Sequence, residues 1–454
     1  MSRGRLHAAG AAVALLSIAG AAGSADPATS SLEGETPKAW RQLGGSAQYT
    51  TVDGTIVGTS VPDKANSFSV TKQEFGDFIL DLDVRQDIGP TNSGIQFRSL
   101  STAQFHEGRV HGYQVDIDPS ERAWSGGIYE EAERGWLYPV DLNPPAKSLY
   151  RFGEWNHMRL EALGRRIRVW INEQPVSDLI DDGHDSGFIG LQVHGIEKPE
   201  DAGRTTKFRN LRVRTQKLEP APPMGIFIRN TLANDLDPDE ARQGWRLLWD
   251  GRSAKGWRSA AGDRFPDKGW SMADGALSVQ PGGGGGDIMT EEQFGAFELQ
   301  MEFKTTAGAN SGIFYFLTAA HDPASGAPLG LEYQILDDER HPDAKAGIDG
   351  NRTIASLYDI LPRAPLAGNV GIGPKIDAWQ HARIVARADG SVEHWLNGVK
   401  VLQFNRHSDD YRAHVAASKF KSTPAFGEAA RGHILLQDHG DAVRFRSIKI
   451  RPLE

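Results

Sequence analysis

Short segments in which apolar and polar residues alternate recur along the whole chain. The clearest are residues 78–84 (FILDLDV), 166–171 (RIRVWI) and 296–303 (AFELQMEF). A period of two places the apolar side chains on one face of a β-strand. Turn-forming pairs such as Asp53-Gly54 and Asn397-Gly398 punctuate the chain, and no long segment shows the helical period. The pattern predicts an all-β fold made of antiparallel sandwiches.

The same succession of motifs occurs twice. Trp155–Leu160 (WNHMRL) returns as Trp379–Ile384 (WQHARI). The repeat distance of roughly 220 residues is far longer than a solenoid or propeller unit, so each copy is a whole domain. Further matched pairs are Phe75-Gly76 with Phe294-Gly295, Asn92–Ile95 with Asn310–Ile313, Tyr113-Gln114 with Tyr333-Gln334, Tyr129-Glu130 with Tyr358-Asp359, Trp170–Asn172 with Trp395–Asn397, Leu191–Gly195 with Leu436–Gly440, and Phe208-Arg209 with Phe445-Arg446. The sequence therefore predicts two homologous domains.

Composition divides the 454 residues into five segments. They are a secretory signal peptide (1–25), a disordered tether rich in Ser, Thr, Pro and Glu (26–37), a first sandwich (38–217), a proline-rich linker (218–238) and a second sandwich (239–454). The signal peptide is predicted from Arg3 and Arg5 before the apolar run 8–22. An uncleaved membrane anchor is the alternative reading of that run.

Charge and cysteine content narrow the environment and the partners. The net charge is −9, and no block of Lys and Arg occurs, which argues against nucleic acid or an anionic membrane surface as a partner. The chain has no cysteine, so exported domains would rely on core burial without disulfides. We expect a periplasmic or secreted protein with no membrane span after signal cleavage and a neutral or polar small-molecule ligand.

Differences between the copies indicate where chemistry could occur. By motif alignment, Glu332, His394 and Asp438 of the second copy replace groups that cannot transfer a proton or bind a metal, namely Gly112, Val169 and Val193 of the first. If Glu332, Gln334 and His394 face one sheet surface, they could perform acid/base chemistry or hold a divalent metal. The alternative is that His394 packs against the neighbours of Trp395 and Glu332 is solvated. The second copy is the better candidate for catalysis.

Polar residues common to both copies allow a second interpretation. They form the pairs His194/His439, Asn92/Asn310 and Gln114/Gln334. Such residues could line a shared sugar-binding surface, or they could shape turns and loop corners.

Glu298, Gln300 and Glu302 alternate on one predicted strand face, like the paired acids of β-sandwich glycosidases. The central acid of that arrangement is missing, so we expect a solvated sheet face instead.

The motifs of the second copy resemble the 3-keto-disaccharide hydrolase family, formerly a domain of unknown function. They are Asn310–Ile313, Glu332–Asp338 with His341–Lys345, Gly350–Thr353 with Ser356–Asp359, Glu393–Gly398 and Leu436–Gly440. The resemblance covers almost all of residues 244–453, and residues 38–216 look like a divergent member. It implies two tandem concanavalin A-like jelly-roll sandwiches.

The resemblance also implies an activity and the residues that carry it. Members of the family are described as 3-keto-glycoside lyases and 3-keto-2-hydroxy-glucal hydratases, acting on glycosides already oxidised by a separate glycoside 3-dehydrogenase. The catalytic candidates are Glu332, His394, His341, Asp438 and His439, with Glu332 and His394 as acid/base pair or as ligands of a divalent metal. The substrate-binding candidates are Asn310, Gln334, Asp337, Arg352 and Tyr358, with Asn92, Gln114 and His194 in the first copy.

Two other functions remain open. The same sandwich serves lectins, so a non-catalytic carbohydrate-binding protein is the main alternative. A glycosidase acting on unoxidised glycosides is the second alternative, and it would need two carboxyl groups flanking the bond.

Overall fold

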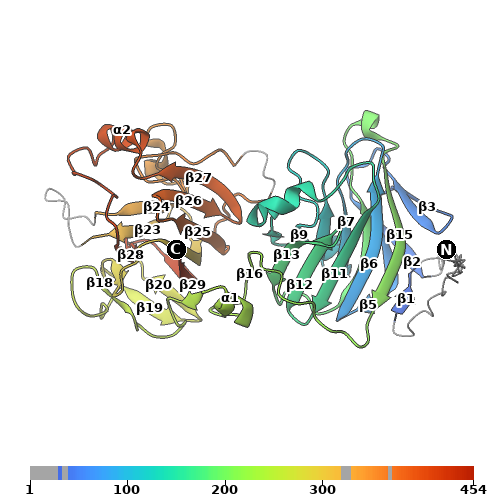
Figure 1. Cartoon of the computed structure of the whole chain (residues 1–454), viewed down its shortest axis with the longest axis horizontal. Helices are drawn as coiled ribbons and strands as arrows, with labels where there is room; N and C mark the ends of the chain where they lie inside the picture. Colours follow the sequence, from blue (N-terminus) through green and yellow to red (C-terminus); the bar gives the residue numbers. More distant parts are fainter. Residues whose placement is uncertain (1–28, 33–38, 319–328, 367–370, 454) are drawn as a thin grey trace, which may run out of the picture.

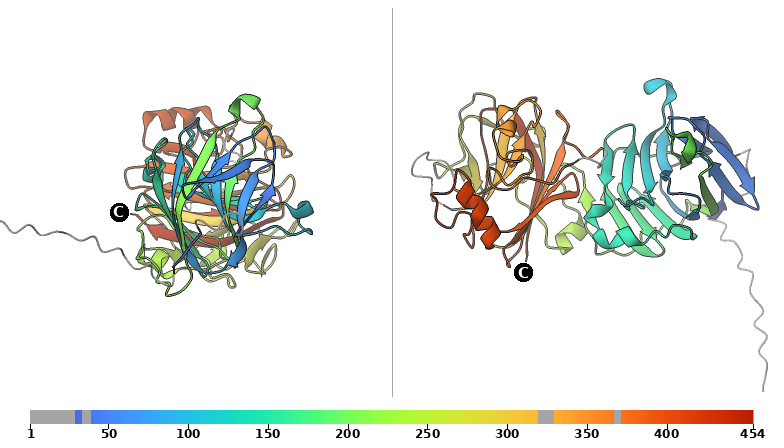
Figure 2. Two further views of the ribbon diagram at one scale, coloured as in Figure 1. Left: turned by 90° about the vertical axis from the view of Figure 1, so that its right-hand side faces the viewer. Right: turned by 90° about the horizontal axis from the view of Figure 1, so that it is seen from above.

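A computed structural model describes residues 29–32, 39–318, 329–366 and 371–453. Its two β-sandwiches follow one another along the long axis of the molecule (Figures 1 and 2). Two α-helices occur in these described ranges, α1 (Pro238–Arg242) and α2 (Asp409–Ala417). The predicted all-β fold of two tandem jelly-roll sandwiches is confirmed. Residues 1–25, the predicted signal peptide, lie outside the described residues.

The N-terminal domain consists of two facing sheets. Its larger sheet has nine strands: β1 (Thr29–Ser31), β3 (Gln48–Val52), β4 (Thr55–Thr59), β6 (Phe78–Gln86), β11 (Asn156–Leu163), β12 (Arg166–Ile171), β13 (Gln174–Ile180), β15 (Thr205–Arg214) and β16 (Arg229–Asn230). Its smaller sheet has seven: β2 (Trp40–Gly44), β5 (Ser67–Phe75), β7 (Ser93–Leu100), β8 (His111–Ile117), β9 (Ile128–Glu131), β10 (Gly135–Tyr138) and β14 (Gly187–Val193).

The C-terminal domain repeats this plan. Its larger sheet has eight strands: β17 (Arg246–Leu247), β19 (Trp270–Ala273), β20 (Ala276–Val279), β22 (Phe297–Thr305), β25 (Gln380–Ala386), β26 (Ser391–Leu396), β27 (Val399–Asn405) and β29 (Val443–Pro452). Its smaller sheet has five: β18 (Trp257–Ser259), β21 (Ile288–Thr290), β23 (Asn310–Leu317), β24 (Leu331–Leu336) and β28 (His433–Leu436).

Apart from β9, β10 and β16 of the N-terminal domain, the strand orders of the two domains match one to one. The larger sheets run β13-β12-β11-β6-β15-β4-β3 and β27-β26-β25-β22-β29-β20-β19, and the smaller sheets run β2-β5-β14-β7-β8 and β18-β21-β28-β23-β24. The duplication read from the motifs is thus a duplication of topology.

The core of each domain lies between its two sheets. In β22, Phe297, Leu299, Met301 and Phe303 point inward and are at most 1% exposed. Burying one such side chain contributes about 1.5–3 kcal/mol. The period-two pattern therefore decides which face of each strand meets the partner sheet.

The opposite face of β22 is not solvated, so that expectation is wrong. Glu298 pairs with Arg383 (2.5 Å) and Arg451, and Glu302 pairs with Arg229 and Arg446 (both 2.8 Å). The carboxylates of this face are therefore neutralised in ion pairs, and Glu302 also lines a cavity of about 470 Å³ between the two domains.

The segment between the domains covers this face, so it does not behave as a free linker. Arg229 lies in β16, which extends the large sheet of the N-terminal domain by pairing with β13, and it also binds Glu302 of the C-terminal domain. Glu240 of α1 forms a buried ion pair with Lys449 at 2.8 Å. The segment therefore binds to both domains.

The two domains also pack directly against each other. Ile372 and Val399 of the C-terminal domain belong to the apolar cluster of the N-terminal core. Lys375 Nζ donates a hydrogen bond to the backbone oxygen of Arg134 at 3.2 Å. The two domains are joined through side chains of both.

Part of the predicted disordered tether is ordered. Thr29–Ser31 forms β1, which pairs antiparallel with β15, and Leu32 accepts a hydrogen bond from the Trp40 indole at 3.3 Å. The segment TSSL has a single apolar residue, so it offers no strand pattern that the sequence could reveal. Residues 33–38 lie outside the described residues. In the described part of the chain no helix has the length and apolarity that crossing a membrane requires.

Candidate functional site

Strand pairing corrects one of the three differences between the copies. In β23 and β24, Gly312 pairs with Gln334 and Phe314 with Glu332. In β7 and β8, Gly94 pairs with Asp116 and Gln96 with Gln114. The counterpart of Glu332 is therefore Gln114 and not Gly112, and the counterpart of Gln334 is Asp116.

The next strand supports the corrected register. The backbone of Tyr358 bonds to Glu332 at 3.1 Å, and Tyr129 is paired with Gln114 in β9 and β8. The other two assignments hold, because His394 and Val169 pair with the equivalent residues Ile384 and Leu160. Leu436 pairs with Ile313 and Leu191 pairs with Ile95, the last residues of the two equivalent Asn-Ser-Gly-Ile (NSGI) segments. Asp438 and Val193 each lie two residues after these leucines, so they occupy equivalent positions.

Glu332 lies on the outer face of the smaller C-terminal sheet. Its neighbours Leu331 and Tyr333 point into the core, so alternation sends Glu332 to the other side. A methyl group on Gly312 would collide with the Glu332 carboxylate, so the glycine makes room for it. Only 6% of Glu332 is exposed, and its carboxylate accepts no hydrogen bond from the residues the structure describes.

Burial without a hydrogen-bond donor changes the acidity of Glu332. Desolvation raises its pKa to about 8, with Lys419 opposing the rise and Asp287 and Asp343 adding to it. Burial lowers the pKa of Lys419, whose ammonium lies 4.2 Å from the Tyr358 ring. A carboxyl group of this kind can exchange a proton near neutral pH.

A network of charged side chains forms one wall beside Glu332. Arg352 binds Asp343 and Asp359, each at 2.7 Å, and the Tyr358 hydroxyl donates to Asp343 at 2.8 Å. Burial opposes ionisation of Asp343, but the bonds from Arg352 and Tyr358 outweigh it and lower its pKa. The predicted substrate-binding residues Arg352 and Tyr358 thus lie in one wall, with their polar groups already engaged by Asp343.

Two amide oxygens on this face lack partners. Asn310 Oδ1 and Gln437 Oε1 are buried without a hydrogen bond. An unsatisfied buried acceptor costs about 1–3 kcal/mol, so each calls for an explanation. A ligand hydroxyl could satisfy both. Gln334 lies on the same face and accepts a bond from the backbone nitrogen of Ile335 at 2.9 Å.

His394 does not share a surface with Glu332, and this expectation is wrong. It lies in the core, 0% exposed, with Nδ1 3.0 Å from the Ala355 oxygen and Nε2 2.8 Å from the Tyr315 hydroxyl. Since a carbonyl only accepts, Nδ1 carries the proton and Nε2 accepts from Tyr315. Burial lowers the pKa of His394 to about 4. Both ring nitrogens are engaged, so Glu332 and His394 do not fit as joint ligands of a metal.

The remaining catalytic candidates occupy loops. The Asp438 carboxylate accepts from the backbone nitrogens of Gly285, Gly286 and Gly440 at 3.0–3.1 Å, so it holds in place the glycine loop, a run of five glycines at residues 282–286. His341 caps a 3₁₀ turn by accepting from the Asp343 nitrogen at 3.2 Å. Asp337, a predicted sugar ligand, accepts from three backbone nitrogens and Arg340, so it organises a turn.

His439 is exposed. Burial raises the pKa of Asp287. Sequence reasoning missed Asp287 and Lys419, because neither lies in a motif shared by the copies.

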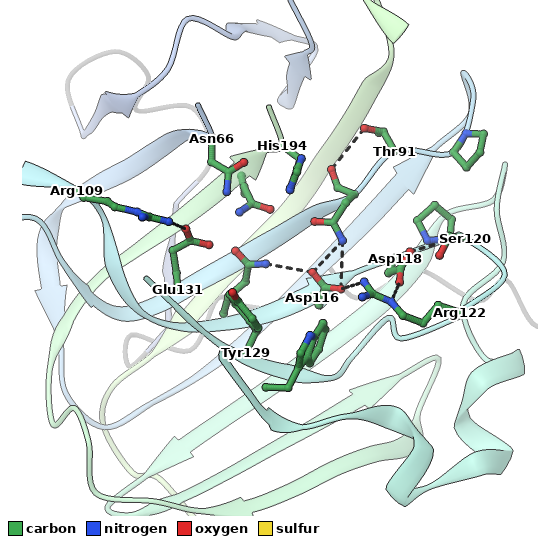
Figure 3. Close-up of a pocket in the computed structure, with 16 residues that line it drawn as sticks. Asn66, Thr91, Arg109, Asp116, Asp118, Ser120, Arg122, Tyr129, Glu131 and His194 are labelled. Atoms are coloured by element: carbon green, nitrogen blue, oxygen red, sulfur yellow. Dashed lines mark hydrogen bonds and ion pairs between the residues drawn. The ribbon is translucent and has the colours of Figure 1, made fainter. Parts of the chain in front are cut away.

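The predicted residues of the first copy do meet at one place. Asn92, Gln114 and His194 line a cavity of about 560 Å³ on the outer face of the smaller N-terminal sheet (Figure 3). Asp116 lies in the same cavity and is buried, and desolvation raises its pKa to about 7.

A cluster with metal-binding composition lies elsewhere in the N-terminal domain. Glu130, Glu133 and His184 place one ligand atom each within 4.8 Å of one another. Arg134 already binds both carboxylate oxygens of Glu130 at 2.5 and 2.6 Å. The cluster therefore functions as an ion-pair network in this arrangement.

Comparison with known proteins assigns both copies to one group. A profile described as the 3-keto-alpha-glucoside-1,2-lyase-like domain matches residues 27–214 and 244–451. The resemblance read from the motifs of the second copy is confirmed, and so is the family membership expected of the first copy.

The chain is also similar to individual proteins. A protein of Bacteroides thetaiotaomicron named 3-keto-disaccharide hydrolase is 36% identical over 236 residues, which is 46% of this chain and 79% of that protein. A solved structure from Parabacteroides distasonis, named provisionally as a glycosyl hydrolase, is 28% identical with a TM-score of 0.43 and covers 49% of this chain and 100% of its own. A carbohydrate binding module of Bacillus subtilis is 19% identical with a TM-score of 0.27, over 39% of this chain and 97% of its own.

Proposed function

Because the chain belongs to the 3-keto-alpha-glucoside-1,2-lyase-like family, we propose that its C-terminal domain cleaves glycosides whose sugar carries a ketone at C3. The observation that carries the proposal is Glu332, a buried carboxyl group with a pKa raised to about 8, on a sheet face beside Lys419 and Tyr358. The curated relative's name, 3-keto-disaccharide hydrolase, supports the same substrate class.

The chemistry needs a base, because a ketone at C3 acidifies the hydrogen on C2. Glu332 in its carboxylate form takes that proton, and the C2–H electron pair forms an enolate with its charge on the C3 oxygen. The nearby Lys419 ammonium stabilises this charge. A buried carboxylate is a stronger base than a solvated one, since its pKa is closer to that of the proton donor.

Elimination and hydration complete the reaction. The enolate electrons form the C1=C2 double bond as the C1–O bond breaks, and the departing oxygen takes up a proton and leaves as an alcohol. Water then adds to C1 and a proton returns to C2, which gives the 3-keto sugar. Elimination followed by hydration amounts to hydrolysis.

The wall beside Glu332 positions the sugar. Asn310 Oδ1 and Gln437 Oε1 accept ligand hydroxyls, which satisfies the two buried acceptors. Arg352 is held by Asp343 and Asp359, so it orders the wall and takes no part in proton transfer.

The context of the reaction is part of the proposal. The C3 ketone must come from a separate dehydrogenase acting on the intact glycoside. Export to the periplasm or medium is supported by the leader-like residues 1–25 and by the absence of cysteine. Cell fractionation with detection of the mature N-terminus tests this.

The test uses the full chain, because the segment between the domains binds to both. Purified protein is incubated with a nitrophenyl 3-keto-glucoside and with its unoxidised parent, and nitrophenol release is followed. Release from the keto compound alone, lost in Glu332→Gln, is the expected result. Equal release from both would indicate a glycosidase, and saturable binding without release would indicate a lectin-like protein.

A further inference from the structure

The N-terminal cavity has a different distribution of polar groups from the C-terminal site. The position of Glu332 carries an amide, Gln114, and the position of Gln334 carries a carboxyl group, Asp116. The acid and the amide have exchanged places along equivalent strands. Two residues along a strand span about 6.6 Å, so the acid lies beside different atoms of any ligand.

Asp116 is held firmly at the cavity floor. Asn92 Nδ2 and Gln114 Nε2 donate to it at 3.1 Å, and Arg122 lies at 3.8 Å (Figure 3). Gln96 fixes the other end of Gln114 by donating to its Oε1 at 2.8 Å. The amide of Gln114 is therefore oriented by two bonds and cannot act as a base toward carbon.

One acceptor in this cavity lacks a partner. Gln192 is 1% exposed, lines the cavity, and its Oε1 accepts no hydrogen bond. Its counterpart by register is Gln437, whose Oε1 is equally unpaired in the C-terminal domain. Both copies thus keep one buried oxygen ready for a hydroxyl donor.

The walls of the cavity favour a neutral, hydroxylated ring. Two arginines, Arg109 and Arg122, stand against three carboxyl groups, Asp116, Asp118 and Glu131, so an anionic ligand is disfavoured. Tyr129 and Trp136 supply aromatic surface, with ring centroids 5.2 Å apart. Aromatic faces beside paired polar groups suit a pyranose.

We infer that the N-terminal domain holds a second, non-cleaving carbohydrate site, in which Gln192, Asp116 and the Trp136 wall bind a neutral pyranose. The ligand class rests on the proposed function of the C-terminal domain. The exchange of acid and amide turns one copy into a binding module and leaves elimination to the other.

The experiment uses the full chain with Glu332→Gln, which disables the proposed base. This protein is titrated with methyl 3-keto-glucoside and, separately, with unoxidised methyl glucoside, and tryptophan fluorescence is followed. Methyl glycosides are used because they carry no nitrophenyl group. We expect a saturable change that is absent when Trp136→Phe is added. Gln192→Leu weakens the binding about tenfold, in line with loss of one buried hydrogen bond. The matched change Gln437→Leu leaves this signal unaltered.

The outcomes separate the inference from the proposed function. No saturable signal with either sugar, or a signal that follows Gln437 and ignores Gln192, overturns the second site. If the Glu332→Gln protein still releases the alcohol, and adding Asp116→Asn abolishes that release, then the N-terminal site cleaves its ligand and the inference of a non-cleaving site is wrong. If sugar binding depends on Gln192 but the wild-type protein cleaves no glycoside, the N-terminal site is supported and the proposed function of the C-terminal domain is rejected.

A second variant guards against misfolding of Gln192→Leu. Arg122→Met lies at the rim, where the side chain is 25% exposed and its guanidinium lies 5.1 Å from the Trp136 ring. It should also weaken the binding. Far-UV circular dichroism of each variant must match that of the parent.

Discussion

The two domains share a topology but differ in where a buried acid stands on the smaller sheet. In the C-terminal domain the acid is Glu332, and in the N-terminal domain it is Asp116, two residues further along the equivalent strand. Glu332 accepts no hydrogen bond from the described residues, whereas Asp116 accepts two from side-chain amides. Glu332 is therefore free to exchange a proton, whereas Asp116 is held in place by hydrogen bonds.

The comparison shows how a duplicated site can diverge without changing its fold. Exchange of acid and amide preserves the polarity of the face and the number of hydrogen-bonding groups, so the sheet tolerates it. What changes is which ligand atom meets a proton acceptor. Four predictions test this reading.

The largest effect is expected from giving the C-terminal domain the N-terminal arrangement. The double change Glu332→Gln with Gln334→Asp should lower kcat/KM on a 3-keto-glucoside about 10²–10⁴-fold, because the base is removed from its position. Glu339→Gln, the same Glu-to-Gln substitution at a side chain that is 82% exposed, is the control for loss of the acid and should have no effect. Retention of activity in the double variant would show that Glu332 is not the base.

The second prediction concerns stability against pH. Burial raises the pKa of Glu332 to about 8 and that of Asp116 to about 7. Between the ordinary and the raised values the folded state binds more protons than the unfolded state, so both groups make stability fall as pH rises. The contribution of Asp116 to the free energy of unfolding is lost between about pH 4 and pH 7, and that of Glu332 is lost over a range that continues to about pH 8.

Urea unfolding of the wild type, Glu332→Gln and Asp116→Asn at successive pH values checks this. The loss should amount to a few kcal/mol for each group, since one pKa unit is worth about 1.4 kcal/mol. Glu332→Gln should flatten the profile up to pH 8, and Asp116→Asn only up to pH 7. Identical profiles for all three proteins would contradict the raised pKa values.

Third, His394→Val gives the C-terminal domain the residue of its counterpart, Val169. The change removes two buried hydrogen bonds and leaves the Tyr315 hydroxyl without its partner. We expect a loss of about 2–4 kcal/mol in the free energy of unfolding with kcat/KM unchanged. A drop in kcat/KM in the folded variant would instead restore His394 as a functional residue.

The smallest effect is expected at Gly312. Alanine there would push the Glu332 carboxylate aside, and a displacement of this size should lower kcat about tenfold while the sheet persists. Gly295→Ala, where the new methyl group meets only ordinary contacts, is the matched control. Equal kcat values for the two variants would mean that the position of Glu332 does not matter.

The register error shows why motif alignment alone could not find the counterpart of Glu332. Tyr113-Gln114 and Tyr333-Gln334 match in letters but are displaced by two residues in strand pairing. A slip of two residues keeps every side chain on its face, so the period-two pattern is blind to it. Only the pairing with the NSGI strand reveals it.

Other parts of the site depended on distant segments. Lys419 reaches Glu332 from the segment after α2, and Asp287 from the end of the glycine loop, and neither belongs to a repeated motif. His394 alternates correctly on its strand, but the pattern does not say that its inner face meets Tyr315 of the opposite sheet.

The all-β class, the duplication and the strand faces could be read from the amino-acid sequence, because local periodicity and repeated motifs specify them. The tertiary structure alone decided that Glu298 and Glu302 are neutralised beneath the segment between the domains, and that Glu332 is buried without a hydrogen-bond donor from the described residues. The acidity of a carboxyl group depends on the water and charges around it. Those surroundings come from segments far apart in the chain, which only folding brings together.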